Sequence, residues 1–182
     1  MKKLTVAVAA ALLVLAAAAA FAQETPPVLL QSTGRIDADG IISPDEYSLS
    51  IPLPRARLAL RWSQETLCIG ITAPTAGWVA VGLGSRKMDG ALIVIGYAKG
   101  SLAQLKIQKG SGHGHGDTPS EAMLAYAVTE KGATTTMELV LRASSVIGES
   151  QTGLDMIAAF GGSDSFSGLH RWRAPLAVAL GR

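Results

Sequence analysis

Four side chains in this sequence offer a soft sulfur or an imidazole nitrogen in unusual surroundings: Met88, His113, His115 and His170. Met88 is a lone thioether in a polar turn between two apolar runs, and His170 immediately precedes the last apolar run. A thioether and an imidazole form an axial ligand pair of low-spin haem iron. Such iron has both axial positions filled, which suits electron transfer and disfavours oxygen activation. An electron-transfer site is therefore one interpretation of these residue types, provided that the fold brings Met88 and His170 together; a purely structural role for His170 is the alternative.

The two remaining histidines leave other possibilities open. His113 and His115 alternate with glycine in a segment that ends in Asp117. Two imidazoles and a carboxylate can bind a metal ion, and either histidine could replace His170 as the partner of Met88. A mobile, solvated glycine loop is the simpler interpretation, and we favour it.

Other familiar chemistries lack the residues they need. The chain has one cysteine, Cys68, so it has no thiolate cluster, no internal disulfide and no Cys-x-x-Cys-His attachment site for c-type haem. It contains neither a Gly-x-Ser-x-Gly nor a His-Glu-x-x-His motif. Cys68 lies in an apolar run and is expected to be a buried thiol. We therefore expect an electron carrier or binding module, not a stand-alone enzyme.

Three acids near the start of the domain, Asp37, Asp39 and Asp45, raise the question of calcium. Their spacing lacks the glycine and the closing glutamate of an EF-hand loop. Asp-Gly and Ser-Pro pairs in the same segment mark turns. Turn-forming acids are therefore the better interpretation.

Residues 1–22 have the pattern of a secretory signal peptide, with two lysines, an Ala/Leu/Val run and the cleavage motif Ala-Phe-Ala. Cleavage leaves a neutral chain, because it removes two of the 16 basic side chains and none of the 14 acidic ones. No basic run suggests a nucleic-acid surface, and no second apolar segment is long enough to span a membrane. We expect an exported, soluble domain in the periplasm or outside the cell.

The rest of the sequence is a series of short apolar and alternating runs separated by turns. A Pro-containing lead-in at 23–32 is expected to be loose, and one domain should occupy 33–182. Alternation is clearest at 134–141, where every second residue is apolar or threonine. Pro175 interrupts the last run, which predicts an edge strand there. Eight or more short strands without a competing helical period predict an all-β, immunoglobulin-like antiparallel β-sandwich.

Several of these runs resemble known motifs. Residues 77–84 (Gly-Trp-Val-Ala-Val-Gly-Leu-Gly) and 88–97 (Met-Asp-Gly-Ala-Leu-Ile-Val-Ile-Gly-Tyr) resemble the core motif of DOMON domains. Residues 36–47 look like the opening of secreted bacterial members. Residues 165–173 (Ser-Phe-Ser-Gly-Leu-His-Arg-Trp-Arg) are similar to the closing motif, in which Arg-Gly usually follows the histidine. The resemblance covers 33–180.

The resemblance implies a sandwich that binds one small ligand. In cytochrome-type members this ligand is b-type haem, held non-covalently by a methionine and a histidine that match Met88 and His170. Trp78, in the core motif, is then expected to border the cofactor. Arg171 and Arg173, or alternatively Arg86, could pair with the haem propionates.

The resemblance also implies possible partners and alternative ligands. In some proteins the domain is joined to a membrane cytochrome b561 unit. This chain has none, so a membrane redox partner would be a separate protein. Other members are thought to bind sugars or to act as interaction modules, which leaves a haem-free carbohydrate or small-ligand module and a ligand-free interaction domain as alternatives. The chain has few aromatic residues for sugar stacking, 5% of the total.

Overall fold

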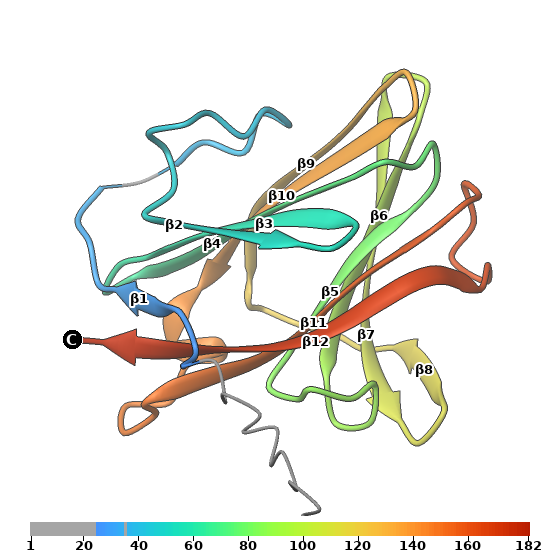
Figure 1. The fold of residues 1–182 in the computed structure, drawn as a ribbon. Helices are drawn as coiled ribbons and strands as arrows, with labels where there is room; N and C mark the ends of the chain where they lie inside the picture. Colours follow the sequence, from blue (N-terminus) through green and yellow to red (C-terminus); the bar gives the residue numbers. More distant parts are fainter. Residues whose placement is uncertain (1–24, 35) are drawn as a thin grey trace, which may run out of the picture.

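The computed structural model describes residues 25–34 and 36–182, which form two facing β-sheets (Figure 1). The strands are β1 (Val28–Leu30), β2 (Leu49–Leu53), β3 (Ala56–Trp62), β4 (Thr66–Ala73), β5 (Val79–Leu83), β6 (Leu92–Lys99), β7 (Leu102–Ser111), β8 (Gly114–Asp117), β9 (Met123–Lys131), β10 (Thr134–Arg142), β11 (Gly153–Gly161) and β12 (His170–Gly181). A short 3-10 turn, η1 (Ala143–Ser145), follows β10.

One sheet has the strand order β1-β12-β11-β5-β6-β7-β8, and the other has the order β2-β3-β4-β10-β9. Neighbouring strands are antiparallel except β1, which runs parallel to β12. The prediction of an all-β antiparallel sandwich is therefore confirmed. The predicted signal peptide at 1–22 lies outside the described residues. Among the residues that are described, no helix is long and apolar enough to cross a membrane.

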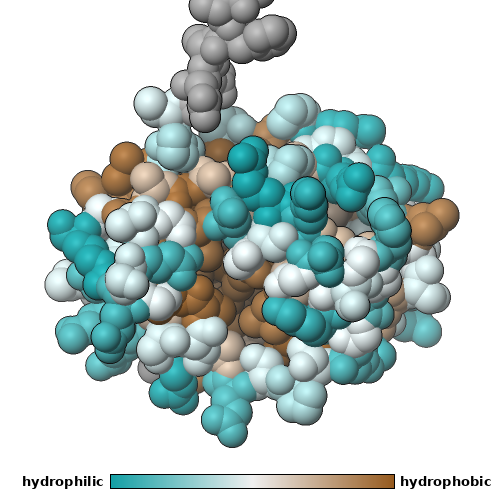
Figure 2. Space-filling view, turned by 90° about the horizontal axis from the view of Figure 1, so that it is seen from below, coloured by the Kyte–Doolittle hydropathy of each residue, from teal (hydrophilic) through white to brown (hydrophobic). Residues whose placement is uncertain are grey.

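The core lies between the sheets and is built from every second residue of the central strands. In β10 these residues are Thr135, Met137, Leu139 and Leu141, each at most 1% exposed. In β5 the inward residues are Val79, Val81 and Leu83. Because side chains alternate across a strand, the residues between them face outward. The surface seen from below is mostly hydrophilic, with an apolar hollow near its middle (Figure 2).

The structure contains three strands that the sequence did not predict: β1, β2 and β8. Part of the expected loose lead-in is β1, which pairs with Ala179–Gly181 of β12 and buries Leu29 completely. The segment at 114–117, expected to be a mobile loop, is β8 and pairs with the end of β7. β1 is too short and β8 too rich in glycine to show a period of two, whereas β2 (Leu-Ser-Ile-Pro-Leu) does alternate. Backbone pairing holds each of them in place: β1 pairs with β12, β2 with β3 and β8 with β7.

The edge prediction for Pro175 is correct only in part. β12 lies between β1 and β11, so it is not the outermost strand of its sheet. However, β1 pairs only with Ala179–Gly181, so Pro175 has a strand partner on one side, Ile157 of β11. Proline has no N–H to donate, and this is tolerated because no strand of the described residues pairs with that side of Pro175.

The N-terminal strap, residues 36–47, covers the outer face of the smaller sheet and is anchored on Glu138 of β10. One oxygen of this carboxylate accepts bonds from the backbone N–H groups of Asp39, Gly40 and Ile41 at 3.1, 2.7 and 3.1 Å. The other oxygen accepts a bond from the Tyr47 hydroxyl at 2.7 Å. Glu138 is only 1% exposed, and this burial raises its pKa.

Of the three acids expected to form turns, Asp39 does so in the structure, and Glu46 supports a second turn. Asp39 accepts a bond from the backbone N–H of Ile41 at 2.8 Å, which closes a local turn. The Glu46 carboxylate accepts the N–H of Ser43 at 2.8 Å around the Ser-Pro turn. The strap is thus held by local turns and one buried carboxylate.

Candidate functional site

A cavity of about 280 Å³ lies on the outer face of the seven-stranded sheet. Its floor consists of small and aliphatic side chains that point outward from β5, β6 and β11: Ala80, Gly82, Ile93, Ile95, Ile157 and Ala159. Glycine and alanine at the centre of this floor leave room that larger side chains would fill. The volume is just below the range of typical small-molecule pockets, so a larger flat ligand would extend past the rim.

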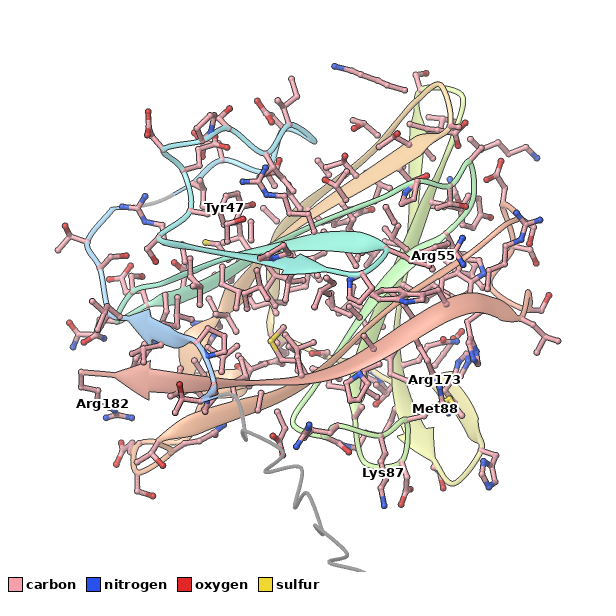
Figure 3. All side chains as sticks on the ribbon, in the orientation of Figure 1. Tyr47, Arg55, Lys87, Met88, Arg173 and Arg182 are labelled. Atoms are coloured by element: carbon pink, nitrogen blue, oxygen red, sulfur yellow. The ribbon has the colours of Figure 1, made fainter. Side chains whose placement is uncertain are left out.

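Three connections between strands form the walls of the cavity. The β5–β6 turn contributes Met88, the β7–β8 hairpin contributes His113 and His115, and the β11–β12 loop leads to His170. The structure therefore brings Met88 and His170, which are far apart in the sequence, to one cavity. In Figure 3, Met88 lies beside β8 at the lower right, whereas the neighbouring Lys87 points downward and away.

Trp78 also borders the cavity and packs against the loop that carries His170. A Cβ at Gly161 would collide with the indole ring, and a Cβ at Gly168 would lie 3.3 Å from its Nε1 atom. Gly161 is the strand partner of His170. Trp78 is 5% exposed, and its Nε1–H has no hydrogen-bond partner. Trp78 thus helps to position the β11–β12 loop.

The predicted arginines do not all reach the cavity. Arg173 lines it and lies on the same side of the molecule as Met88 (Figure 3). Arg171 is exposed and packs over Gly162, so it is not among the lining residues. Arg86 is exposed in the turn that carries Met88 and does not line the cavity either.

The β5–β6 turn is fixed to the β7–β8 hairpin at Gly110. A Cβ at this position would collide with the carbonyl oxygen of Met88. The N–H of Gly110 donates to the carbonyl of Ala91 at 2.9 Å, and its carbonyl accepts the N–H of Gly90 at 3.1 Å. The Asp89 carboxylate also accepts a backbone N–H from the hairpin turn at 2.8 Å. The sequence analysis missed this role of Gly110, which only the contact reveals.

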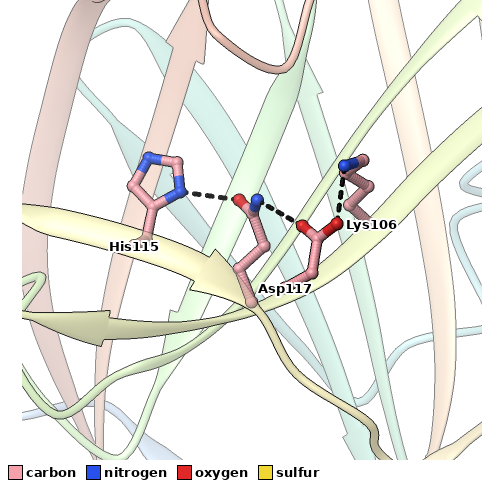
Figure 4. A network of polar contacts seen from close by, with 4 residues as sticks. Lys106, His115 and Asp117 are labelled. Carbon is pink, nitrogen blue, oxygen red and sulfur yellow. Dashed lines mark hydrogen bonds and ion pairs between the residues drawn. The ribbon is translucent and has the colours of Figure 1, made fainter.

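A chain of polar contacts orders the hairpin (Figure 4). Lys106 Nζ donates to Asp117 Oδ2 at 2.7 Å, Gln108 Nε2 donates to Asp117 Oδ1 at 2.8 Å, and Gln108 Oε1 lies 2.7 Å from His115 Nδ1. The bonds from Lys106 and Gln108 lower the pKa of Asp117. The hairpin is therefore an ordered strand pair, contrary to the expectation of a mobile loop.

The contacts of Asp117 also answer the question of a separate metal site in the hairpin. Asp117 is engaged by Lys106 and Gln108 and does not join His113 and His115 as a third ligand. Within 25–34 and 36–182, no group of three or more His, Cys, Asp and Glu side chains could hold a metal ion. The side chains lining this cavity that could bind a metal are the Met88 thioether and the imidazoles of His113, His115 and His170.

The residues present fit a flat, apolar, iron-containing group. The floor is smooth and apolar, a thioether and an imidazole come from different walls, and Arg173 supplies a cation for a carboxylate. The loop before His170 exposes Leu169, which is 88% accessible, so the rim on that side is open.

Several solved structures are similar to this chain, three of them as follows. The cytochrome domain of cellobiose dehydrogenase from Myriococcum thermophilum matches with a TM-score of 0.56 and 9% identity over 72% of this chain and 81% of that one. The cytochrome b domain of pyranose dehydrogenase from Coprinopsis cinerea matches with a TM-score of 0.54 and 12% identity, over 68% of this chain and 76% of that one. A family 9 carbohydrate binding module from Caldicellulosiruptor kristjanssonii, in complex with cellotriose, matches with a TM-score of 0.55 and 10% identity, over 87% of this chain and 95% of that one.

No protein-family model matches the sequence, and no curated protein matches it by sequence. At these identities the three structural matches show a shared fold. That fold is the sandwich of cytochrome b domains and of a carbohydrate binding module.

Proposed function

We propose that this chain is an exported b-type haem domain of the DOMON cytochrome type, with Met88 and His170 as the axial ligands. The observation that carries the proposal is that both side chains line one cavity with an apolar floor. The likeness of the fold to two cytochrome domains supports it. When bound, the haem would supply a one-electron couple on the outer face of the larger sheet.

The residues of this chain have distinct tasks in the proposal. Met88 and His170 hold the iron from the β5–β6 turn and the start of β12. Trp78 positions the loop before His170, and the outward side chains of β5, β6 and β11 would exclude water from the part of the haem that enters the cavity. Arg173 pairs with a propionate, and the exposed Arg171 can pair with a second one at the rim. The chain carries electrons for a separate redox partner, such as a membrane cytochrome b561, and has no turnover of its own.

The test is reconstitution of the mature protein with haem. We expect a sharp low-spin ferrous spectrum that the double variant Met88→Ala/His170→Ala loses. Lys87→Ala is the matched control, because this side chain belongs to the same turn and points away from the cavity (Figure 3). If the double variant keeps the wild-type spectrum, the ligand assignment is wrong. If the wild type takes up no haem, the cytochrome proposal fails.

A carbohydrate-binding module is the second candidate. The observation in its favour is the family 9 module, which matches over more of this chain than the cytochrome domains do, 87% against 72% and 68%. Against it, the cavity aromatics Trp78 and Phe166 are both at least partly buried, so they present little surface for stacking. Calorimetric titration of the haem-free protein with cellotriose distinguishes the candidates, since only a sugar-binding module gives saturable heat.

A further inference from the structure

His115 projects from the hairpin toward the place where Met88 lies. In the pairing of β7 with β8, His115 is directly opposite Gly110. Directly opposed residues of antiparallel strands project from the same face, with their Cβ positions about 5 Å apart. The Cβ position of Gly110 is occupied by the backbone of Met88. His115 and Met88 therefore stand side by side on one wall of the cavity.

The hydrogen-bond chain fixes which nitrogen of His115 carries the proton. Lys106 and Gln108 both donate to Asp117, because a carboxylate can only accept (Figure 4). The amide group of Gln108 must then turn its oxygen toward the ring. His115 Nδ1, at 2.7 Å from this oxygen, has to donate. In the neutral imidazole the lone pair is consequently on Nε2.

This arrangement is the one that metal-binding histidines use. Such histidines almost always donate their other ring N–H to an oxygen, which fixes the tautomer and raises the basicity of the free nitrogen. Here the oxygen belongs to Gln108, which is 6% exposed and itself held by Asp117. The imidazole of His115 therefore already has the tautomer that an iron ligand needs, with Nε2 free to bind. His113, at the hairpin turn, lies outside this network.

We propose that His115 is a reserve axial ligand, which binds the iron through Nε2 when the thioether of Met88 is absent or displaced. The proposal rests on the function proposed above, since it needs haem in the cavity. Imidazole is a good ligand of iron, and the iron would then have His115 and His170 as its two axial nitrogens.

The decisive variants remove Met88 alone and together with each hairpin histidine. We expect reconstituted Met88→Ala to remain low-spin, with the electron paramagnetic resonance and magnetic circular dichroism signature of two imidazoles in place of the thioether. Met88→Ala/His115→Ala should become high-spin. Met88→Ala/His113→Ala, the matched control, should remain low-spin. In the Met88→Ala background, Gln108→Leu should weaken haem binding about 10–100-fold.

The outcomes separate the two proposals. If the wild type shows thioether ligation and Met88→Ala is high-spin, the reserve ligand is disproved while the cytochrome function stands. A low-spin Met88→Ala/His115→Ala protein also disproves it. If the wild type takes up no haem, both proposals fail. Nitrogen NMR of the haem-free protein gives an independent check: His115 should carry its proton on Nδ1, and a proton on Nε2 in the neutral ring would contradict the argument.

Discussion

Asp117 illustrates how a single exposed carboxylate can order a glycine-rich segment. It accepts bonds from Lys106 and Gln108, and through Gln108 it sets the orientation of His115. These donors favour the ionised form, which lowers the pKa of Asp117. When the pKa of a carboxyl group is lower in the folded than in the unfolded protein, its ionised form stabilises the fold at pH values above the unfolded-state pKa. This stabilisation is lost as the pH falls through the folded-state pKa.

We predict that Lys106→Met raises the pKa of Asp117 toward its ordinary value, because it removes the largest cause of the shift. Carbon NMR titration of the Asp117 carboxyl group measures this directly. Lys109→Met is the matched control, since Lys109 Nζ bonds to the carbonyl of Gly90 and not to Asp117. The difference in stability between wild type and Asp117→Asn should be present at neutral pH and should shrink as the solution is acidified below the ordinary carboxyl pKa. Equal pKa values in wild type and Lys106→Met would contradict the role of Lys106.

At the scale of elements, the site depends on how the β5–β6 turn meets the β7–β8 hairpin. Gly110 is the point of contact, because its missing side chain admits the carbonyl of Met88. The two segments are far enough apart in sequence that no local pattern links them. The contact explains why a thioether in a polar turn stays at the wall of the cavity and does not move freely in solvent.

We predict that Gly110→Ala destabilises the protein by about 1–3 kcal/mol, the usual cost of forcing an extra methyl group into a packed contact. It should also displace the β5–β6 turn, and with it any thioether ligation of added haem. Gly116 belongs to the same hairpin and has open space at its Cβ position, so Gly116→Ala is the matched control with little loss. Urea unfolding of both variants gives the comparison, and equal destabilisation would argue against the contact.

At the scale of the whole molecule, the N-terminal segments extend one sheet of the sandwich and cover the outer face of the other. β1 extends the larger sheet by pairing with the end of β12, and the N-terminal strap covers the outer face of the smaller sheet. Leu29 of β1 is completely buried within the main core. The start of the described chain is thus part of the packed domain.

We predict that Leu29→Ala lowers the free energy of unfolding by about 2–5 kcal/mol, the range for removing a buried leucine from a packed core. The neighbouring Leu30 is 63% exposed, so Leu30→Ala should change stability by no more than about 0.5 kcal/mol. Chemical denaturation measures the free energy of unfolding of both variants, with the same dependence of that free energy on denaturant concentration for each. If the two variants are equally stable, β1 does not contribute to the core in solution.

Much of the fold could be predicted from local patterns. The alternation at 134–141 places Met137, Leu139 and Leu141 on one face and Glu138 on the other, and the structure has the first three in the core. It could not show that Glu138 is buried as well, because the N-terminal strap that covers it lies about a hundred residues earlier. The same holds for β1 and β8, which have no distinctive period and exist because β12 and β7 offer them backbone partners.

The sequence by itself determined the sandwich class, through its period of two, and singled out Met88 and His170, through their positions in motifs that resemble those of DOMON domains. Only the tertiary structure decided that Met88, His170, Trp78 and Arg173 line one cavity and that Arg171 does not. It also shows that residues 110–117, expected to be a mobile loop, form an ordered hairpin in which the imidazole of His115 is oriented by a hydrogen bond. The physical reason is that a cavity wall is made by strands and turns far apart in sequence, whose contacts depend on sheet order and register.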